Sequence, residues 1–361
     1  MTTTDRLVER LAELISFDTR NPDGDERPLV QRLATELRAL GAVTVEEVDV
    51  GDHAYVYARF GGPHPRVLLN AHVDTVPAND GYTSPPHLLV RRGDRLHGLG
   101  TADIKGAIAA ILDALAAGPV NRPVGVLFSG DEEHGGSCIR AFLETEAARG
   151  LERAIVCEPT RCRVGVRHRG IGAATVTLEA AGGHSSRVDD MVNPIAVLAR
   201  AAVALDDMGI EYRSKGPPGF QGINLNVAAL DGGIAFNVIP TRAKLTFSLR
   251  QAPGDSVDAL LGEAERRVRA VTSPHAIAWS VSIASPSLQP RDVAGFESLL
   301  GPRMADTVDL GYWTEASRLS ERGIDAVVFG PGDVAQAHAA DEYVEIAELE
   351  AARAAFAHVL R

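Results

Sequence analysis

The stretch VLLNAHVDTVPA, residues 67–78, indicates the class of fold and contains the first candidate functional residues. It begins with Val67, Leu68 and Leu69, a short apolar run that predicts a strand buried on both faces. The strand is followed by His72 and Asp74, an imidazole and a carboxylate two residues apart, just before a proline. Because side chains two apart on a strand point to the same side, both are expected to face one site.

Around this strand, helical and strand patterns alternate up to about residue 164, which is typical of a mainly parallel sheet covered by helices on both faces. The sequence predicts a β-hairpin around Gly93 and Asp94. The expected helices cover about residues 5–15, 28–40, 104–117 and 137–148, and the expected strands about 43–48, 54–60, 67–71, 124–128 and 153–156.

The pattern changes at about residue 166 to longer, alternating strands with two helices, near residues 194–206 and 255–271. This predicts a smaller antiparallel α+β domain that ends near residue 285. The strand in GIDAVVFGPG and a final helix over about 346–360 return to the first pattern. We therefore expect an α/β catalytic domain made of residues 1–165 and 286–361, interrupted by an inserted domain of residues 166–285.

The composition limits the classes of function. The chain has 361 residues, 45% hydrophobic residues and a formal net charge of −12, which argues against nucleic acid or an anionic membrane as the main partner. The N-terminal apolar residues have helical spacing unlike a signal peptide, and no run approaches the ~18 apolar residues of a membrane span. Three cysteines without a CxxC pair favour a reducing cytoplasm over a disulfide framework or a cysteine zinc site.

Polar side chains recur at the ends of the predicted strands, where ligands bind in an open parallel sheet. Taken singly, each has an ordinary alternative: a surface or core histidine, a solvated acidic turn, or, for Asp103, a helix N-cap. Several strand ends with ligand-type side chains at one edge favour a common site. The set comprises His72 and Asp74, Asp103, Asp131 with Glu132 and Glu133, Glu158, and His338 with Asp341 and Glu342.

Histidine and carboxylate ligands without cysteine suit a catalytic zinc, manganese or cobalt site. Three or more carboxylates packed together without cations would raise each other's pKa values and destabilise the fold. Two divalent ions about 3.5–4 Å apart would remove that repulsion, and a single carboxylate, Asp103, could bridge them.

The motifs HVDTVP, GLGTADIKGA, SGDEE, CEPT, GGHSS and AQAHAADEYV occur in this order along nearly the whole chain. Together they resemble the dinuclear zinc deacylases and exopeptidases, a family that includes acetylornithine deacetylase and succinyl-diaminopimelate desuccinylase. SFDTRNP, RHRGI, WTEAS and FGPGDVAQAH are most similar to the acetylornithine and acetylcitrulline deacetylase branch. The resemblance implies a zinc-exopeptidase-like catalytic domain with a ferredoxin-like lid, which commonly also forms a homodimer interface.

The resemblance also implies roles for individual residues. His72 and Glu158 would hold one Zn²⁺, Glu133 and His338 the other, and Asp103 both, with Co²⁺ or Mn²⁺ as substitutes and a cis peptide between Asp103 and Ile104. Glu132 would be the general base and Asp74 would orient His72. The remaining implied roles are oxyanion stabilisation by His184, in dimeric relatives from the partner's lid, and substrate contacts by Arg250, Asn237 and Thr314.

The implied function is hydrolysis of an N-acetyl amino acid, acetylornithine or acetylcitrulline, in arginine biosynthesis. A succinyl-diaminopimelate desuccinylase, a dipeptidase or carboxypeptidase, a mononuclear metal protein and a non-catalytic binding protein are the alternatives. Without the resemblance, His184 would be a histidine in a glycine turn and Arg250 a solvated strand-end residue. The ammonium group of ornithine would need an acid such as Glu315, whereas the neutral ureido group of citrulline would not.

Overall fold

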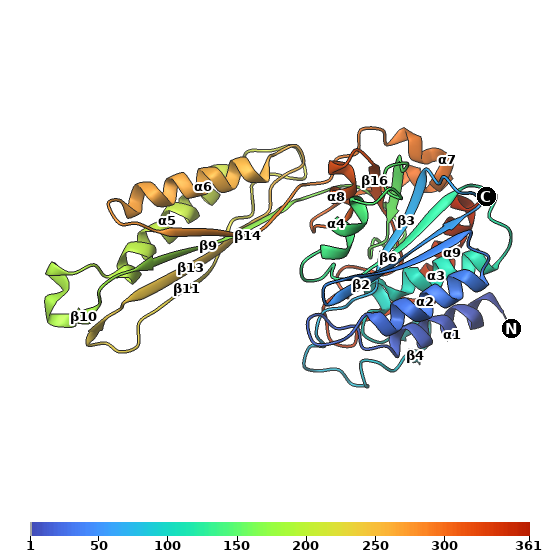
Figure 1. Ribbon diagram of the computed structural model, residues 1–361, viewed down its shortest axis with the longest axis horizontal. Coiled ribbons are helices and arrows are strands. Elements are labelled where there is room, and N and C mark those ends of the chain that lie inside the picture. Colours follow the sequence, from blue (N-terminus) through green and yellow to red (C-terminus); the bar gives the residue numbers. More distant parts are fainter. Residues whose placement is uncertain (1) are drawn as a thin grey trace. The chain divides into compact units, whose positions relative to one another are not determined.

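Strand β3 (Val67–His72) lies inside an eight-stranded sheet with the order β1-β2-β6-β3-β7-β16-β8-β15, in a computed structural model that describes residues 2–361 (Figure 1). Its neighbours β6 (Val124–Ser129) and β7 (Arg153–Val156) run parallel to it, and β16 (Asp325–Val328) runs parallel to β7. All six residues of β3 are buried, as the apolar run predicts. The carboxyl ends of these four strands therefore lie at one edge.

The outer strands make the sheet mixed rather than wholly parallel. Strand β2 (His53–Phe60) is antiparallel to both β1 (Thr44–Val50) and β6, and β8 (Val164–His168) is antiparallel to β16. The last strand of the sheet is β15 (Thr307–Leu310). The expectation of a mainly parallel sheet thus holds for its four central strands, which are the ones that carry candidate site residues.

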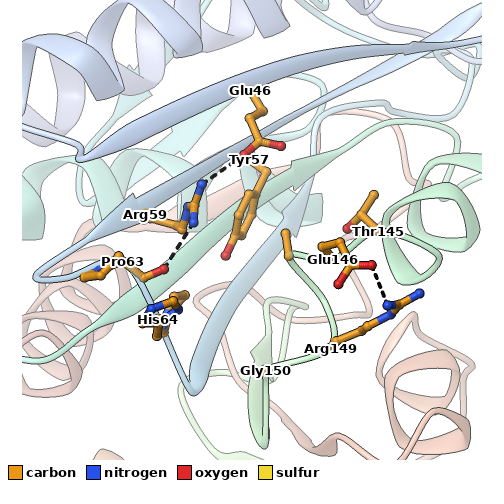
Figure 2. Close-up of a pocket in the computed structure, with 11 residues that line it drawn as sticks. Glu46, Tyr57, Arg59, Pro63, His64, Thr145, Glu146, Arg149 and Gly150 are labelled. Carbon is orange, nitrogen blue, oxygen red and sulfur yellow. Dashed lines mark hydrogen bonds and ion pairs between the residues drawn. The ribbon is translucent and has the colours of Figure 1, made fainter.

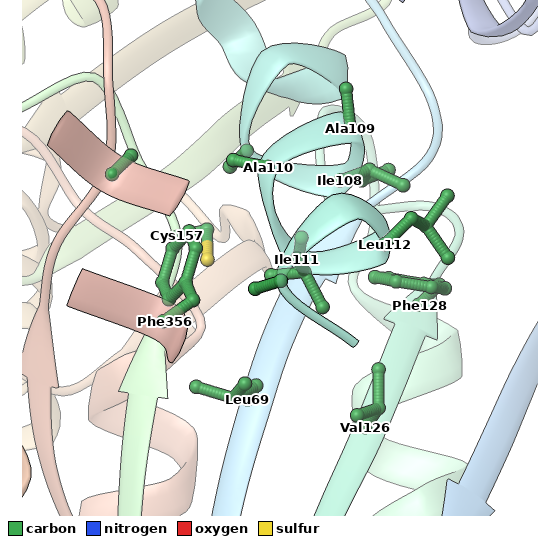
Figure 3. Packing of buried hydrophobic residues seen from close by; sticks show 14 of the residues in the cluster. Leu69, Ile108, Ala109, Ala110, Ile111, Leu112, Val126, Phe128, Cys157 and Phe356 are labelled. Atoms are coloured by element: carbon green, nitrogen blue, oxygen red, sulfur yellow. The ribbon is translucent and has the colours of Figure 1, made fainter. Parts of the chain in front are cut away.

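Helices cover both faces of this sheet, and the alternation of side chains along the strands explains how (Figure 1). In β2, Val56 belongs to the large core beneath the helices α1, α2, α3 and α9, whereas Tyr57 points the other way and packs against Phe142 of α4, with ring centroids 5.0 Å apart. Figure 3 shows Ile111 of α3 facing Leu69 of β3 in that large core. The helices of this unit are α1 (Thr3–Ile15), α2 (Arg27–Ala39), α3 (Gly106–Ala116), α4 (Ser137–Leu143), α7 (Glu297–Leu300), α8 (Ala316–Glu321) and α9 (Ile346–Val359).

The chain divides into two compact units. The first comprises Met1–Val166, Pro290–Val308 and Thr314–Arg361, and the second comprises Arg167–Gln289 and Asp309–Trp313. The first unit also contains a small antiparallel sheet of β4 (Val90–Arg92), β5 (Arg95–His97) and β17 (Tyr343–Glu345), which includes the hairpin expected at Gly93.

The second unit has the βαββαβ order of a ferredoxin-like fold. Its elements are β9 (Ile171–Glu179), α5 (Pro194–Tyr212), β11 (Asn226–Gly232), β13 (Arg242–Leu249), α6 (Val257–Thr272) and β14 (Ala278–Ser285). The sheet order is β11-β13-β9-β14, and each strand is antiparallel to its neighbours. A separate two-stranded ladder joins β10 (Gly183–His184) to β12 (Val238–Ile239). Short 3-10 turns cover Ser185–Asp190, Ala294–Phe296 and Gly301–Ala305.

Two helices differ in length from their expected ranges. Helix α5 continues to Tyr212 rather than ending near residue 206, because Met208 is fully buried and the Tyr212 hydroxyl donates to Glu263 of α6. Helix α4 ends at Leu143 rather than near residue 148, and turns follow it. Tertiary packing thus overrides local sequence preference in α5. In the part of the chain that the structure describes, no helix combines the length and apolar character that crossing a bilayer requires.

We predict that Ile111→Ala lowers the free energy of unfolding by about 2–5 kcal/mol, because Ile111 is fully buried between α3 and the sheet and the truncation leaves a cavity. Urea denaturation of both proteins would measure the difference. The matched control is Val203→Ala in α5, where the side chain is 61% exposed and the change should stay within about 0.5 kcal/mol. Equal effects of the two substitutions would contradict this description of the core.

Candidate metal centre

The candidate ligands meet at the carboxyl edge of the central strands, and all of them belong to the first unit. His72 is the last residue of β3. Glu133 lies in the turn after β6, and Glu158 is two residues beyond the end of β7. His338 lies in the loop after β16, and its backbone has a φ of 60°. The parallel pairing of β3 with β6 and β7 explains how residues so far apart in sequence come to one place.

His72 is buried with both ring nitrogens next to oxygen atoms. Its Nε2 lies 3.1 Å from Oδ1 of Asp103 and 4.0 Å from Oε2 of Glu158. Its Nδ1 lies 3.0 Å from the main-chain oxygen of Asp74 and 3.5 Å from the Asp74 carboxylate. The nearest acceptor for Nδ1 is therefore the Asp74 carbonyl, whereas the sequence suggested the carboxylate.

The Asp74 carboxylate is fully buried and accepts hydrogen bonds from the turn that carries the acids. It accepts from the backbone N–H groups of Glu132 and Glu133, each at 3.1 Å, and from the side-chain amide of Asn21 at 3.2 Å. Burial alone would raise the pKa of Asp74, but the hydrogen bonds with His72, Asn21 and the Glu133 N–H lower it below its ordinary value. Asp74 thus holds the Glu132–Glu133 turn as well as contacting His72.

Asp103 lies between the two histidines. Its Oδ2 is 3.5 Å from Nε2 of His338, and that same nitrogen is 3.1 Å from Oε1 of Glu133. Asp103 belongs to an irregular turn over Thr101–Lys105, with φ −123° and ψ 83°, and its peptide bond to Ile104 is cis, as the resemblance implied.

Candidate ligand atoms fall into two groups that share Asp103. One comprises His72, Asp103 and Glu158, and the other Asp103, Glu133 and His338; within each group the ligand atoms lie within 4.8 Å of one another. A third set of the same kind joins His72 to Glu132 and Glu133. Imidazole nitrogens and carboxylate oxygens at these separations fit zinc and similar divalent ions.

The electrostatics of the cluster also fit cations. Burial, and then the neighbouring carboxylates, raise the pKa values of Glu132 and Glu158 well above their ordinary range. Burial would lower the pKa of His72, but hydrogen bonds with Asp103 and Asp74 raise it well above normal. The hydrogen bond with Glu133 raises the pKa of His338 to about 8. Negative charge is therefore in excess here, and the imidazoles partly compensate for it.

Three of the other candidate residues, His184, Asn237 and Arg250, lie in the second unit. His184 is exposed and pairs with Val238 in the β10–β12 ladder, and the N–H of Ser185 donates to the Asn237 carbonyl, so His184 and Asn237 are neighbours. Arg250 is half-buried at the end of β13, its guanidinium has no protein partner among residues 2–361, and burial lowers its pKa. The predicted roles of all three stay predictions.

Thr314 and Glu315 belong to the first unit and are buried. The Thr314 hydroxyl accepts from the backbone N–H of Ala316, the first residue of α8, at 3.2 Å. Glu315 accepts from the Ser129 hydroxyl at 2.8 Å, and burial raises its pKa to about 7. Glu315 is only 1% exposed, so it does not present a carboxylate at the surface for an ammonium group.

Two buried acids next to the site, Glu26 and Glu342, have no role in the predictions made from the sequence. Glu26 lies at the start of α2 and contacts the backbone of Asp131, and Glu342 contacts the backbone of Asp103. Glu342 was among the strand-end acids, but only its burial shows that it differs from an ordinary surface acid.

A hollow of about 600 Å³ lies away from these residues, near the amino end of β3 (Figure 2). Its charged side chains already have partners: Arg59 donates to Thr44, Glu46 and the Pro63 carbonyl, and Arg149 pairs with Glu146. Because no candidate ligand lines this hollow, we assign no catalytic role to it.

Two known deacetylases are similar to this chain over most of its length. The chain is 38% identical to an N-acetyl-L-citrulline deacetylase of Xanthomonas campestris over 95% of this chain and 94% of the relative. It is 31% identical to an acetylornithine deacetylase of Klebsiella pneumoniae, over 90% of this chain and 87% of that protein.

The fold has solved counterparts as well. An M20 family metallo-carboxypeptidase from Sulfolobus solfataricus superposes with a TM-score of 0.81 at 16% identity, over 99% of this chain and 98% of the other. A dinuclear metal-binding peptidase of the same family from Bacillus subtilis gives a TM-score of 0.73 at 15% identity, over 99% and 97% of the two chains. The model of peptidase family M20/M25/M40 matches residues 68–361, and the protein is therefore a member of that family.

Proposed function

We propose that this protein hydrolyses the amide bond of an N-acetyl amino acid and releases acetate and the free amino acid, as a step of arginine biosynthesis. The observation that carries the proposal is the pair of His–carboxylate groups that share Asp103, with Glu132 beside them. The names of the two relatives described above support the substrate class.

Among N-acetyl amino acids, we propose N-acetylcitrulline first and N-acetylornithine second. Identity to the acetylcitrulline deacetylase is 38%, against 31% for the acetylornithine deacetylase. Glu315 is buried and bonded to Ser129, so it offers no surface carboxylate to an ornithine ammonium group. A desuccinylase or peptidase of the same family is the alternative.

His72 and Glu158 would hold one ion and Glu133 and His338 a second, with Asp103 between them. Divalent ions held there, zinc with cobalt or manganese as substitutes, would polarise the amide carbonyl and make water a better nucleophile near neutral pH.

We propose that Glu132 moves the proton. The backbone N–H of Glu132 donates to Asp74. Burial and the neighbouring Glu158 raise the pKa of the Glu132 carboxylate, which makes Glu132 a stronger base. Glu132 would take a proton from the attacking water as the oxygen–carbon bond forms. It would then donate that proton to the amine nitrogen as the carbon–nitrogen bond breaks.

The second unit would supply the substrate contacts. Arg250 has a guanidinium without a protein partner among the described residues, which suits a substrate carboxylate, and His184 would stabilise the oxyanion with Asn237 next to it. We propose a homodimer through this unit, because Ile234 and Phe236 are 90% and 100% exposed there and β11 is an edge strand. Thr314, which lies two residues before α8, would act indirectly.

The compartment that we propose is the cytoplasm. Cys138, Cys157 and Cys162 are all free and buried, and burial raises the pKa of each thiol, which keeps the thiols unreactive. The binding partner that we propose is a small molecule, the N-acetyl amino acid substrate.

We predict that Glu132→Gln lowers kcat for N-acetylcitrulline by about 10²–10⁴-fold, because the amide can neither accept nor return the proton. Steady-state kinetics on zinc-loaded protein would measure this, with Glu146→Gln, an exposed acid, as the control that keeps full activity. Full activity of Glu132→Gln would exclude the proposed mechanism. Cleavage of dipeptides or succinyl-diaminopimelate, with no cleavage of either N-acetyl substrate, would exclude the proposed substrate class.

Metal removal should make stability depend on pH. The folded-state pKa values of Glu132, Glu158, His72 and His338 are all raised, and a group with a raised pKa loses its stabilising contribution as pH rises through that pKa. We therefore expect the melting temperature of chelator-treated protein to fall as the pH rises from 6.5 through about 8, the interval over which His338 loses its proton in the folded protein. Zinc should remove most of this fall, and Glu158→Gln in the metal-free protein should remove the part that Glu158 contributes. Identical pH profiles with and without zinc would count against a metal centre at this place.

If His184 acts across a dimer, two inactive variants should complement each other. After subunit exchange between His184→Ala and Glu132→Gln, each mixed dimer would contain one site with both residues intact. We expect about a quarter of wild-type activity from an equimolar mixture, because half of the dimers are mixed and half of their sites are complete. An inactive mixture, with exchange verified by mass spectrometry of the native dimer, would show that His184 acts within its own subunit. Full activity of His184→Ala alone would show that it has no catalytic role.

A further inference from the structure

Two loops carry the residues that would hold and serve the metal ions, and each loop has a buried glutamate against its backbone. The loop of residues 100–103 ends in Asp103, and the loop of residues 130–133 contains Glu132 and Glu133. Glu342 contacts the first loop and Glu26 the second, and both are more than 100 residues distant along the chain from the loop they contact. Neither glutamate belongs to a candidate ligand group.

Glu342 accepts three hydrogen bonds from successive parts of the Asp103 loop. Its Oε1 accepts from the N–H groups of Ala102 at 2.7 Å and Asp103 at 2.9 Å, and its Oε2 accepts from the N–H of Gly100 at 2.8 Å. The carboxylate is 1% exposed, and its own main-chain oxygen accepts from the N–H of Gly98. These bonds fix the backbone of the turn at the residue whose side chain lies between the two histidines.

Glu26 holds the second loop in a similar way. Its Oε1 accepts from the N–H of Asp131 at 3.0 Å and lies 3.0 Å from Nδ1 of His53, while its Oε2 accepts from the N–H of Ala54 at 3.1 Å. The fit is close, because a Cβ at Gly130 would lie 1.8 Å from Oε2 of Glu26. Asp131 has a φ of 61°, a left-handed conformation that a non-glycine residue rarely adopts and that needs support from its surroundings.

Both glutamates serve only as acceptors. Each carboxylate oxygen faces at least one N–H donor, so the two oxygens are required together. A glutamine of the same shape would keep one acceptor and turn an NH₂ group towards an N–H donor. Burial leaves no water to take over the lost bond, so the mismatch would displace the loop backbone.

We propose that Glu26 and Glu342 are positioning residues, which set the geometry of the metal centre by fixing the backbone of the two loops that carry Asp103, Glu132 and Glu133. This inference rests on the proposed metal centre. Groups that orient metal ligands in this way typically change metal affinity or activity by about 10–100-fold when they are replaced.

A buried acid with a purely structural role provides the matched control. Asp113 in α3 is fully buried and is bound by Arg6 of α1 and Arg353 of α9, with no contact to either loop. Asp113→Asn should therefore lower stability without changing the metal centre. Glu26→Gln and Glu342→Gln should lower stability too, but they should also change the affinity for zinc.

The experiment measures the zinc affinity of wild-type and variant proteins by competition with a chromophoric chelator, together with kcat and KM for N-acetylcitrulline. We expect Glu26→Gln and Glu342→Gln to bind zinc about 10–100-fold more weakly and to have a lower kcat at saturating zinc, with a smaller change in KM. Asp113→Asn should match the wild type in zinc affinity and kcat per folded protein while its melting temperature falls.

Wild-type zinc affinity and kcat in both glutamine variants would overturn the inference, and so would losses in Asp113→Asn equal to theirs. If a glutamine variant gives no folded protein, Glu26→Asp and Glu342→Asp decide, because they keep both acceptor oxygens but withdraw them by one methylene. Wild-type zinc affinity in those variants would also overturn it. A wild-type protein that binds no zinc would instead refute the proposed metal centre, and tight zinc binding without hydrolysis would refute only the proposed substrate.

Discussion

The site depends first on the parallel pairing of β3 with β6 and β7. Parallel strands end at the same edge of a sheet, so this pairing brings the ends of three buried strands, and the residues that follow them, to one place. The strands stay in register because both of their faces are buried, and a shift by one residue would turn their apolar side chains to the wrong layer. The core packing of the first unit is thus also what fixes the spacing between His72, Glu133 and Glu158.

Gathering these carboxylates away from water is electrostatically unfavourable. That unfavourable burial indicates a functional site more clearly than any single residue does. Glu132 and Glu158 have raised pKa values because they are withdrawn from water next to other acids. A protein that needed only stability would not gather such groups, since acids are almost never buried without partners. Asp113 shows the ordinary solution, in which arginine side chains surround the buried acid. At the candidate metal centre the compensating charge is incomplete, which is the condition that bound divalent ions would remove.

Much of the fold was predictable because the sequence patterns are local. The apolar run of β3 and the alternating strands of the second unit identify elements without any tertiary information, and the order of strands and helices indicates a parallel centre with an inserted domain. The extension of α5 to Tyr212 was not predictable, because it depends on packing against α6. For the site, motif order indicated which residues should gather, and the structure brings His72, Asp103 and Glu158 together. The contact of His72 with the Asp74 carbonyl depends on how the turn folds, which spacing does not specify.

Glu26 and Glu342 show where prediction from sequence ends. An acid at the start of a helix usually means a favourable interaction with the helix dipole, and an acid in a loop usually means solvation. What distinguishes these two is that remote backbone N–H groups, from the loops and, for Glu26, also from strand β2, occupy both carboxylate oxygens, a fact of tertiary structure alone. The geometry of the candidate ligands is then determined in part by groups that contact the loop backbone and not the ligand side chains, because a side chain can be placed no more accurately than the backbone that carries it. A carboxylate that accepts several N–H donors restrains that backbone more tightly than apolar packing can, since hydrogen bonds are directional and dispersion contacts are not.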